Sequence, residues 1–208
     1  KLFATLFKRR FMKHLFLFII LAFSLSLSAQ ETTYICAGDV KTLTINPDAG
    51  NVCGGGAAYQ WTSPSNVTTT GTTVTANESG VWTWQISCPS NPSCPPATGT
   101  HTVNIEPDPT SGITINATNS CVGANQTISA TGVPAGYTYS WNFGTGASPA
   151  TSTSASSSVS YSSTGTKTIT LTITKDFTGS TNGCDATCTW TKTTTITISN
   201  LTGSSSCS

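Results

Sequence analysis

The chain has 208 residues, of which only 8% are charged, with nine Lys and Arg residues against eight Asp and Glu residues. Five of the nine basic residues lie within the first 13 positions, so residues 31–208 carry four basic against eight acidic residues, 4 minus 8 or a net charge of −4. Nucleic-acid binding needs a basic surface that neutralises phosphates, and four scattered lysines cannot form one. We therefore exclude a nucleic-acid partner.

Residues 1–30 have the three-part layout of a secretory signal peptide. A basic segment, Lys8–Lys13, precedes an apolar run from Leu15 to Leu27, which ends in Ser28-Ala29-Gln30. A transmembrane helix needs about 20 apolar residues, and this run is shorter. We predict translation from Met12, cleavage near Ala29, and a secreted mature chain without a transmembrane segment. A buried hydrophobic helix is the alternative.

All eight cysteines follow the predicted signal peptide, so in an exported protein they are disulfide candidates. They are Cys36, Cys53, Cys88, Cys94, Cys121, Cys184, Cys188 and Cys207. The pair Cys184 and Cys188 also has a tolerable zinc-ligand spacing. No second close pair with suitable histidines accompanies it, because His101 is the single histidine after residue 30. We predict no metal site.

An internal repeat organises residues 31–208. The segment Cys36–Thr44 matches Cys121–Ser129 in its Cys, Gly, Thr, aliphatic and hydroxyl positions. In both halves an aromatic pair, then a glycine-led alternating strand, a cysteine pair and a Thr-rich strand follow in the same order. The spacing from Cys36 to Cys121 is 85 residues and from Cys121 to Cys207 it is 86, so Cys207 falls where a third repeat would open.

The hydrophobic period within each repeat is two residues, as in the segment Tyr137–Phe143, and this period indicates strands rather than helices. Short strands bounded by Gly, Pro, Asn and Ser over some 85 to 90 residues are typical of a β-sandwich. We predict an all-β protein with two tandem immunoglobulin-like β-sandwich domains after the signal peptide. The predicted domains are residues 31–107 and 108–200, and residues 201–208 form a linker or the start of a third repeat.

The segment Tyr139-Ser-Trp-Asn-Phe-Gly-Thr-Gly146 resembles the Tyr-x-Trp-x-Phe-Gly-Asp-Gly signature of polycystic kidney disease (PKD) domains. The resemblance covers residues 113–198 and departs from the family pattern at Thr145, in place of Asp, and at Lys167, in place of Tyr. The first repeat is more similar to the cysteine-flanked immunoglobulin-like modules of large Bacteroidetes surface proteins. The resemblance implies cell-surface display, adhesion or spacing, and not catalysis.

Equivalence between the repeats predicts that the first cysteine of each repeat joins one of its later pair. Cys36 would then bond to Cys88 or Cys94, and Cys121 to Cys184 or Cys188. Cys53 has no counterpart in the second repeat, and it could form a disulfide with the remaining cysteine of the first repeat. Two interpretations of Cys207 stay open. Its spacing from Cys121 places it at the start of a third repeat, whereas the even number of cysteines would let it pair with the remaining cysteine of the second repeat.

Trp61 and Trp141 are expected in the sandwich cores, because a tryptophan on an inner strand is usually buried. Trp84 is expected to point inward as well. Trp82 and Trp190 are the possible ligand-facing aromatics, although packing in the core or at a sheet edge is the favoured interpretation for both.

No catalytic residues and no cofactor are predicted. The chain has no Gly-x-Ser-x-Gly elbow, His-Glu-x-x-His motif or phosphate-binding loop. Its acids are too scattered to suggest the carboxylate pair of a glycosidase. Glu106 and Asp108 sit in a proline-marked junction, where an interdomain calcium ion is an alternative.

The sequence leaves two functional hypotheses. In the first, the chain is a non-catalytic extracellular structural or adhesion module attached to a cell surface. Its partners would then be neighbouring repeats of the same polypeptide and surface glycans or proteins. In the second, it is an accessory carbohydrate-binding or spacer module of a secreted polysaccharide hydrolase.

Overall fold

The structure is a computed structural model, and it describes residues 31–46, 53, 56–91, 93, 95–177 and 187–200. The predicted signal peptide and residues 201–208 lie outside the described residues. Strands account for nearly all the regular structure of the described part, which confirms the all-β prediction. Among the described residues no helix is long and apolar enough to cross a membrane.

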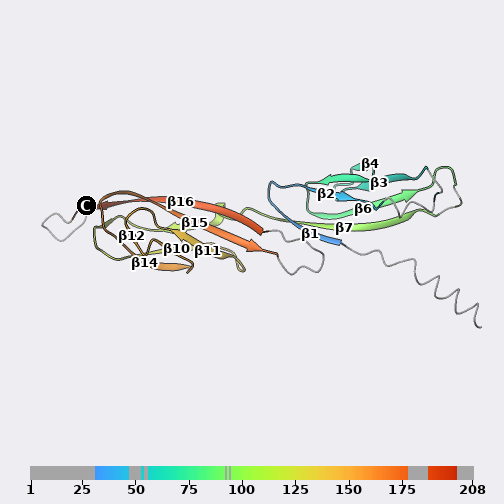
Figure 1. Ribbon diagram of the computed structural model, residues 1–208. Coiled ribbons are helices and arrows are strands. Elements are labelled where there is room, and N and C mark those ends of the chain that lie inside the picture. Colours follow the sequence, from blue (N-terminus) through green and yellow to red (C-terminus); the bar gives the residue numbers. More distant parts are fainter. Residues whose placement is uncertain are drawn as a thin grey trace, which may run out of the picture. The chain divides into compact units, whose positions relative to one another are not determined.

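The first repeat forms a five-stranded sheet and a two-stranded sheet (Figure 1). The larger sheet has the order β1-β7-β6-β3-β4, and the smaller one pairs β2 with β5. The strands are β1 (Glu31–Cys36), β2 (Lys41–Thr44), β3 (Ala58–Thr62), β4 (Thr68–Thr70), β5 (Thr73–Ala76), β6 (Gly80–Ser87) and β7 (Ala97–Glu106).

The second repeat forms a sheet of order β12-β14-β10-β8 and a sheet of order β13-β11-β15-β16-β9. A single turn of 3-10 helix, η2 (Thr110–Gly112), precedes them. The strands are β8 (Thr114–Asn116), β9 (Ser120–Cys121), β10 (Gln126–Thr131), β11 (Thr138–Asn142), β12 (Ala147–Ser148), β13 (Thr151–Ser152), β14 (Ser156–Tyr161), β15 (Gly165–Asp176) and β16 (Thr187–Ser199).

The two larger sheets have the same strand order, which supports the repeat found in the sequence. Read in one direction they are β1-β7-β6-β3-β4 and β9-β16-β15-β11-β13. Trp61 on β3 lies opposite Trp84 on β6, and Trp141 on β11 lies opposite Leu171 on β15. The repeat is therefore one of topology as well as of sequence.

The Cys-x-Gly motif that opens each repeat forms a tight turn. The amide of Asp39 donates to the carbonyl of Cys36 at 2.9 Å, and the amide of Ala124 donates to that of Cys121 at 3.1 Å. The glycine at the third position has a positive φ in both turns, 93° at Gly38 and 79° at Gly123. A turn with a positive φ at its third residue favours glycine there, which explains why both repeats have one.

The core of the second repeat is a single cluster of side chains from both of its sheets. Period-two alternation on β15 turns three apolar side chains inward, and strands β11, β14 and β16 supply most of the other members of the cluster. The buried members are Ile113, Ile128, Trp141, Phe143, Val159, Tyr161, Ile169, Leu171, Ile173, Ile196 and Ile198. Burial of these apolar side chains is the main favourable contribution to the folding of this sandwich.

The segment that resembles the PKD signature contributes two aromatic side chains to this core. Trp141 and Phe143 are buried with their ring centroids 5.6 Å apart. Gly144 follows with a φ of 84°, and a Cβ there would lie 2.7 Å from the carbonyl oxygen of Thr168. Glycine is thus required at this position by both its conformation and its close backbone neighbour.

By their contacts the residues divide into two compact units. The first unit contains residues 43–74 and 81–102, and the second contains residues 32–42, 75–80 and those from 103 onward. The short β1 strand thus belongs almost wholly to the second unit.

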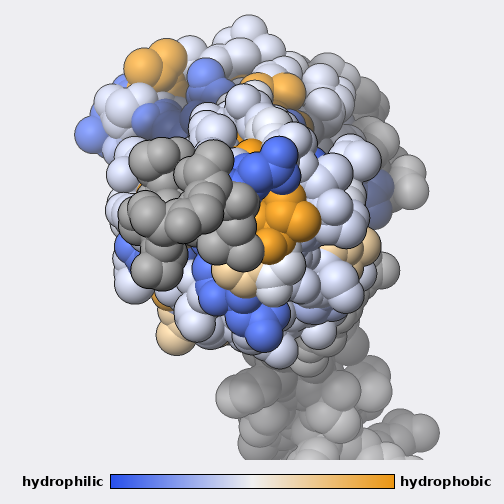
Figure 2. All heavy atoms as spheres, turned by 90° about the vertical axis from the view of Figure 1, so that its left-hand side faces the viewer, coloured by the Kyte–Doolittle hydropathy of each residue, from blue (hydrophilic) through white to orange (hydrophobic). Residues whose placement is uncertain are grey.

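The surface is polar and only weakly charged. In the face that Figure 2 presents, hydrophobic residues form small separate areas among hydrophilic and neutral ones, apart from what the grey atoms cover. The large hydrophobic side chains that are exposed in the described part are three valines, Val40, Val67 and Val81. Scattered residues of this kind are normal on a soluble domain and do not mark a docking patch.

Candidate functional site

The disulfides differ from the expected pairing. Cys36 bonds to Cys188, with a Cα–Cα distance of 5.5 Å, and Cys53 bonds to Cys88, with 5.3 Å. Cys121 is disulfide-bonded as well. The predicted bond from Cys36 to Cys88 or Cys94 is therefore wrong, and so is the option of Cys121 with Cys188. Cys53 does pair with a cysteine of the first repeat, and Cys94, Cys184 and Cys207 lie outside the described residues.

The reason for the difference is the position of Cys36 at one end of the first sheet. The amide of Ala37 donates to the carbonyl of Glu106, at the C-terminal end of β7, and Ser79 contacts the backbone of β7 at Val103. Cys88 follows the other end of β6, which has eight residues and so spans about 25 Å. A disulfide needs Cα atoms within about 7 Å, so Cys36 cannot reach Cys88.

The zinc alternative fails at Cys188, because a cysteine sulfur bonded to Cys36 has no thiolate to offer a metal. Within the described ranges no group of three or more His, Cys, Asp or Glu side chains is placed to hold a metal ion.

The tryptophans divide between core and half-buried positions. Trp61 and Trp141 are each 1% exposed, which confirms their assignment to the core. Trp82 is 4% exposed, so it packs in the core, which was the favoured interpretation, and the possibility that it faces a ligand is wrong. It shares the inward face of β6 with Ile86, because two residues separate them on an alternating strand. Trp190 is half-buried against the core of the second repeat, with its ring 5.9 Å from that of Tyr137.

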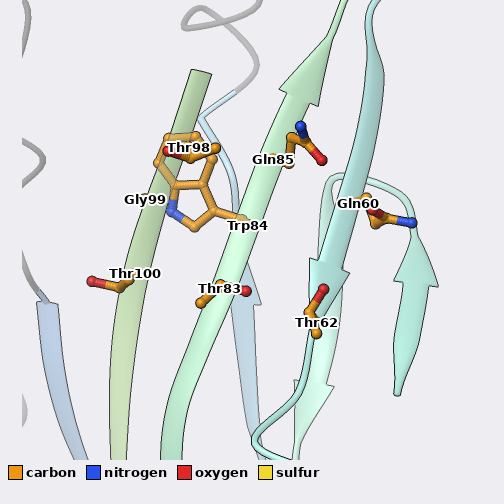
Figure 3. A pocket seen from close by; sticks show the side chains of 8 residues that line it. All are labelled: Gln60, Thr62, Thr83, Trp84, Gln85, Thr98, Gly99 and Thr100. Carbon is orange, nitrogen blue, oxygen red and sulfur yellow. The ribbon is translucent and has the colours of Figure 1, made fainter. Parts of the chain in front are cut away.

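A groove of about 400 Å³ lies on the first unit across strands β3, β6 and β7 (Figure 3). Gln60 lies opposite Gln85 and Thr62 opposite Thr83, and directly opposed residues share one face of a sheet. Thr98 and Thr100 extend the groove on β7, on either side of Gly99. The result is three pairs of neutral hydrogen-bonding side chains on adjacent strands.

Trp84 and Gly99 support the groove from the opposite face of the sheet. Trp84 lies between Thr83 and Gln85 on β6 and is paired with Trp61 on β3. Successive side chains on a strand point to opposite faces, so the Trp84 side chain lies on the face opposite that of Thr83 and Gln85. Its ring reaches from β6 to β7 at Gly99 in Figure 3, and a Cβ on Gly99 would lie 2.3 Å from Cζ2 of the indole. Glycine at position 99 thus leaves the space that the indole occupies. Trp84 lies on the expected inner face, but it is only half-buried.

Replacing Gly99 with valine is expected to displace the Trp84 indole and to lower the free energy of unfolding of the first unit by about 1–3 kcal/mol. Thr100→Val is the matched control, since it changes the neighbouring side chain on the other face without adding an atom near Trp84. Thermal unfolding followed by tryptophan fluorescence measures both. Equal stability of the two variants would contradict the supporting role of Gly99.

The groove's chemistry is neutral. Amides of Gln and hydroxyls of Thr donate and accept hydrogen bonds, and the lining has no Asp, Glu, His, Lys or Arg. General acid–base catalysis needs a titratable group within reach of the reacting atom, and nucleophilic catalysis needs a base beside the hydroxyl. The lining supplies neither kind of group, and its amides and hydroxyls are groups that form hydrogen bonds with neutral partners.

The two carboxylates of the proline-marked junction are engaged within the second unit. Glu106 Oε1 accepts a hydrogen bond from Tyr137 Oη at 2.6 Å, and Asp108 Oδ1 accepts one from the amide of Thr110 at 2.8 Å. Lys175 Nζ lies 5.4 Å from the ring centroid of Tyr137. The sequence offered these two carboxylates as possible calcium ligands. In the structure both accept hydrogen bonds from neighbouring groups of the chain.

Burial raises the pKa of Tyr137 well above its ordinary value of 10, and the hydrogen bond to Glu106 and the negative charges of Glu106 and Asp108 raise it further. The unfolded chain therefore loses this proton at lower pH than the folded chain. The stability from this group is complete below about pH 10 and falls as the pH rises further.

Denaturant unfolding at pH 8 and at pH 11 is expected to show a smaller loss of stability on alkalinisation in Tyr137→Phe than in the wild-type chain. Part of the loss should remain, because burial also raises the pKa of Tyr161. The same loss in Tyr137→Phe as in wild type would contradict the contribution of Tyr137.

Residues 112–188 match the family described as PKD domain. The match includes the motif from Tyr139 to Gly146 and confirms the resemblance seen in the sequence. No curated protein matches the chain.

Among solved structures, the chain is similar to three N-terminal domains of the bacteriophage RB49 highly immunogenic outer capsid protein (Hoc), with 12% identity and a TM-score of 0.45 over 84% of this chain and 69% of that one. Extracellular domains 3–5 of Drosophila OTK align with 10% identity and a TM-score of 0.28 over 82% of this chain and 63% of that one. The four N-terminal Ig domains of Dscam1 isoform 4.44 align with 9% identity and a TM-score of 0.29, over 83% and 45%.

Sequence reasoning missed the groove. Charged and aromatic clusters are the usual signals of a site in a sequence, whereas this groove is lined mainly by Gln and Thr residues that alternate with inward-facing ones. The signal available in the sequence was the run of polar residues on the second face of strands 58–62 and 80–87. That pattern is common to any half-exposed strand, so it does not single out a site.

Proposed function

We propose that the chain is a non-catalytic extracellular module that provides spacing or binding repeats for a larger cell-surface protein, of the adhesin type found in Bacteroidetes. Its repeats would be residues 31–107 and 108–200, behind a signal peptide of residues 1–30. Its partners would be the neighbouring repeats and surface glycans or proteins. The observation that carries this proposal is the strand order shared by the larger sheets of two consecutive repeats, which also contain disulfide bonds.

The polarity of the described residues favours such a role over catalysis. Disulfides are typical of proteins that fold in an oxidising compartment, outside the cytosol. The chain is rich in hydroxyl side chains and poor in charges, and in the described part no three His, Cys, Asp or Glu side chains are placed to hold a metal ion.

Surface exposure of the full-length protein tests the proposal. Antibodies raised against the isolated chain should bind intact cells, and mild protease treatment of those cells should abolish binding. Binding seen only after the cells are permeabilised would contradict the proposal.

The neutral groove favours a second candidate, an accessory module that binds carbohydrate for a secreted polysaccharide hydrolase. Neutral sugars present hydroxyl groups that pair with amide and hydroxyl side chains, and the pairs Gln60–Gln85 and Thr62–Thr83 offer such partners in a row. Binding through uncharged groups should change little between low and high ionic strength.

A glycan array with the wild-type chain separates the two candidates. If the groove binds a neutral glycan, Gln60→Ala combined with Gln85→Ala should reduce binding at least tenfold. Ser140→Ala with Thr172→Ala is the matched control, because these residues form the opposed pair at the equivalent place in the second repeat. Absence of saturable binding by the wild-type chain would remove the carbohydrate candidate and leave the spacer.

A further inference from the structure

The disulfide between Cys36 and Cys188 closes most of the chain into one covalent loop. Cys36 is the last residue of β1, and Cys188 is the second residue of β16. Their separation in sequence is 152, so residues 37–187 lie inside the loop. Of the described strands only β1 and nearly all of β16 lie outside it.

A pulling force applied at the two ends of the chain would follow a short covalent path through these two strands. It would enter β1 at Glu31, cross from Cys36 to Cys188, and leave along β16 toward Ser199. None of the backbone between residues 37 and 187 lies on this path, because tension passes through the bond that closes the loop.

The ladders beside the two strands carry little of this load. β16 pairs with β15 from Thr187 opposite Asp176 to Ile198 opposite Gly165. Force enters and leaves on the same strand, so β15 is not pulled along or away from β16. A strand already rises about 3.3 Å per residue, close to the limit of an extended chain, and so has little length to release.

The bond is sheltered at its β16 end. Cys188 is completely buried. The rings of Tyr34 on β1 and Phe177 after β15 stack with their centroids 4.6 Å apart, so the strand that brings Cys36 is also held by a contact two residues away. A buried sulfur is a poor target for external thiols.

We propose that Cys36–Cys188 is a load-bearing bond, through which the chain transmits tension while the folded parts of both repeats stay unloaded. A module of this kind would keep its length and any binding surface under force. The inference rests on the proposed function only for the source of the tension, which would act on a link in a surface-anchored chain.

Single-molecule stretching of the whole chain, with handles at its two ends, tests the proposal. The oxidised wild-type chain should lengthen only through segments outside residues 36–188. Addition of a reducing agent should then release about 500 Å of further length, since 152 residues extend by about 3.3–3.6 Å each. Release of that length by the oxidised wild-type chain would overturn the proposal.

Two double variants provide matched controls. Cys36→Ser with Cys188→Ser should show long unfolding steps without any reducing agent. Cys53→Ser with Cys88→Ser removes a bond that lies inside the loop, so its oxidised extension should equal that of the wild type. Long steps in the second variant would overturn the proposal, and the wild-type comparison remains decisive even if a variant fails to fold.

The stretching result is independent of where the protein acts. If the oxidised chain resists extension but antibodies bind only permeabilised cells, the load path stands and the surface role fails. If antibodies bind intact cells but the oxidised chain unfolds fully under force, the surface role stands and the load path fails.

Discussion

Replacement of Trp141 with alanine is expected to lower the free energy of unfolding of the second repeat by about 3–5 kcal/mol. The side chain is 1% exposed and its ring lies 5.6 Å from that of Phe143. Its Nε1 donates to the carbonyl of Ser154 at 2.9 Å, so truncation also leaves that acceptor without its partner. Urea unfolding followed by circular dichroism measures the loss.

Two further variants test whether burial is the cause. Trp141→Phe keeps an aromatic ring in the core and removes the hydrogen bond, so its loss should be smaller than that of Trp141→Ala. Trp190→Ala removes a half-buried indole from β16 and should also cost less than Trp141→Ala. Equal losses for Trp190→Ala and Trp141→Ala would contradict the central position of Trp141 in the core.

Removal of the Cys36–Cys188 bond by a double substitution to serine is expected to destabilise the second unit by about 5 kcal/mol. In the chain-entropy treatment a disulfide stabilises by restricting the unfolded chain, and the effect grows with the logarithm of the loop length. The loop here spans 152 residues. Denaturant unfolding under oxidising conditions measures the change.

The bond between Cys53 and Cys88 provides an internal comparison, because it closes a loop of only 35 residues. The same treatment gives about 4 kcal/mol for its removal, roughly 1 kcal/mol less than for the longer loop. A larger loss from Cys53→Ser with Cys88→Ser than from Cys36→Ser with Cys188→Ser would contradict the loop-length argument.

Several features of the fold could be predicted from local sequence patterns. Period-two alternation predicted the strands and the burial of Trp61 and Trp141, because successive side chains on a strand point to opposite faces. The repeated Cys-x-Gly motif marked two equivalent turns, and the Tyr-x-Trp-x-Phe-Gly-x-Gly segment lies within residues 112–188, which match the PKD domain family.

The groove on β3, β6 and β7 could not be predicted from local sequence patterns. The possibility that Trp82 faces a ligand failed because Trp82 lies two residues before Trp84 on β6 and therefore shares its inward face. The groove residues on β3, β6 and β7 become neighbours only through the register that sets Gln60 opposite Gln85. Register depends on pairing between strands distant in sequence, which no local pattern specifies.

The sequence by itself determined the strand period, the turns, the duplicated order of elements and the cysteine content of this protein. The tertiary structure decided which cysteines meet. Cys36 and Cys88 lie in one repeat but at opposite ends of a strand of about 25 Å, whereas Cys188, 152 residues away along the chain, lies within bonding distance of Cys36. A disulfide requires nearness in space, and folding brings strand ends together without regard to their separation in sequence.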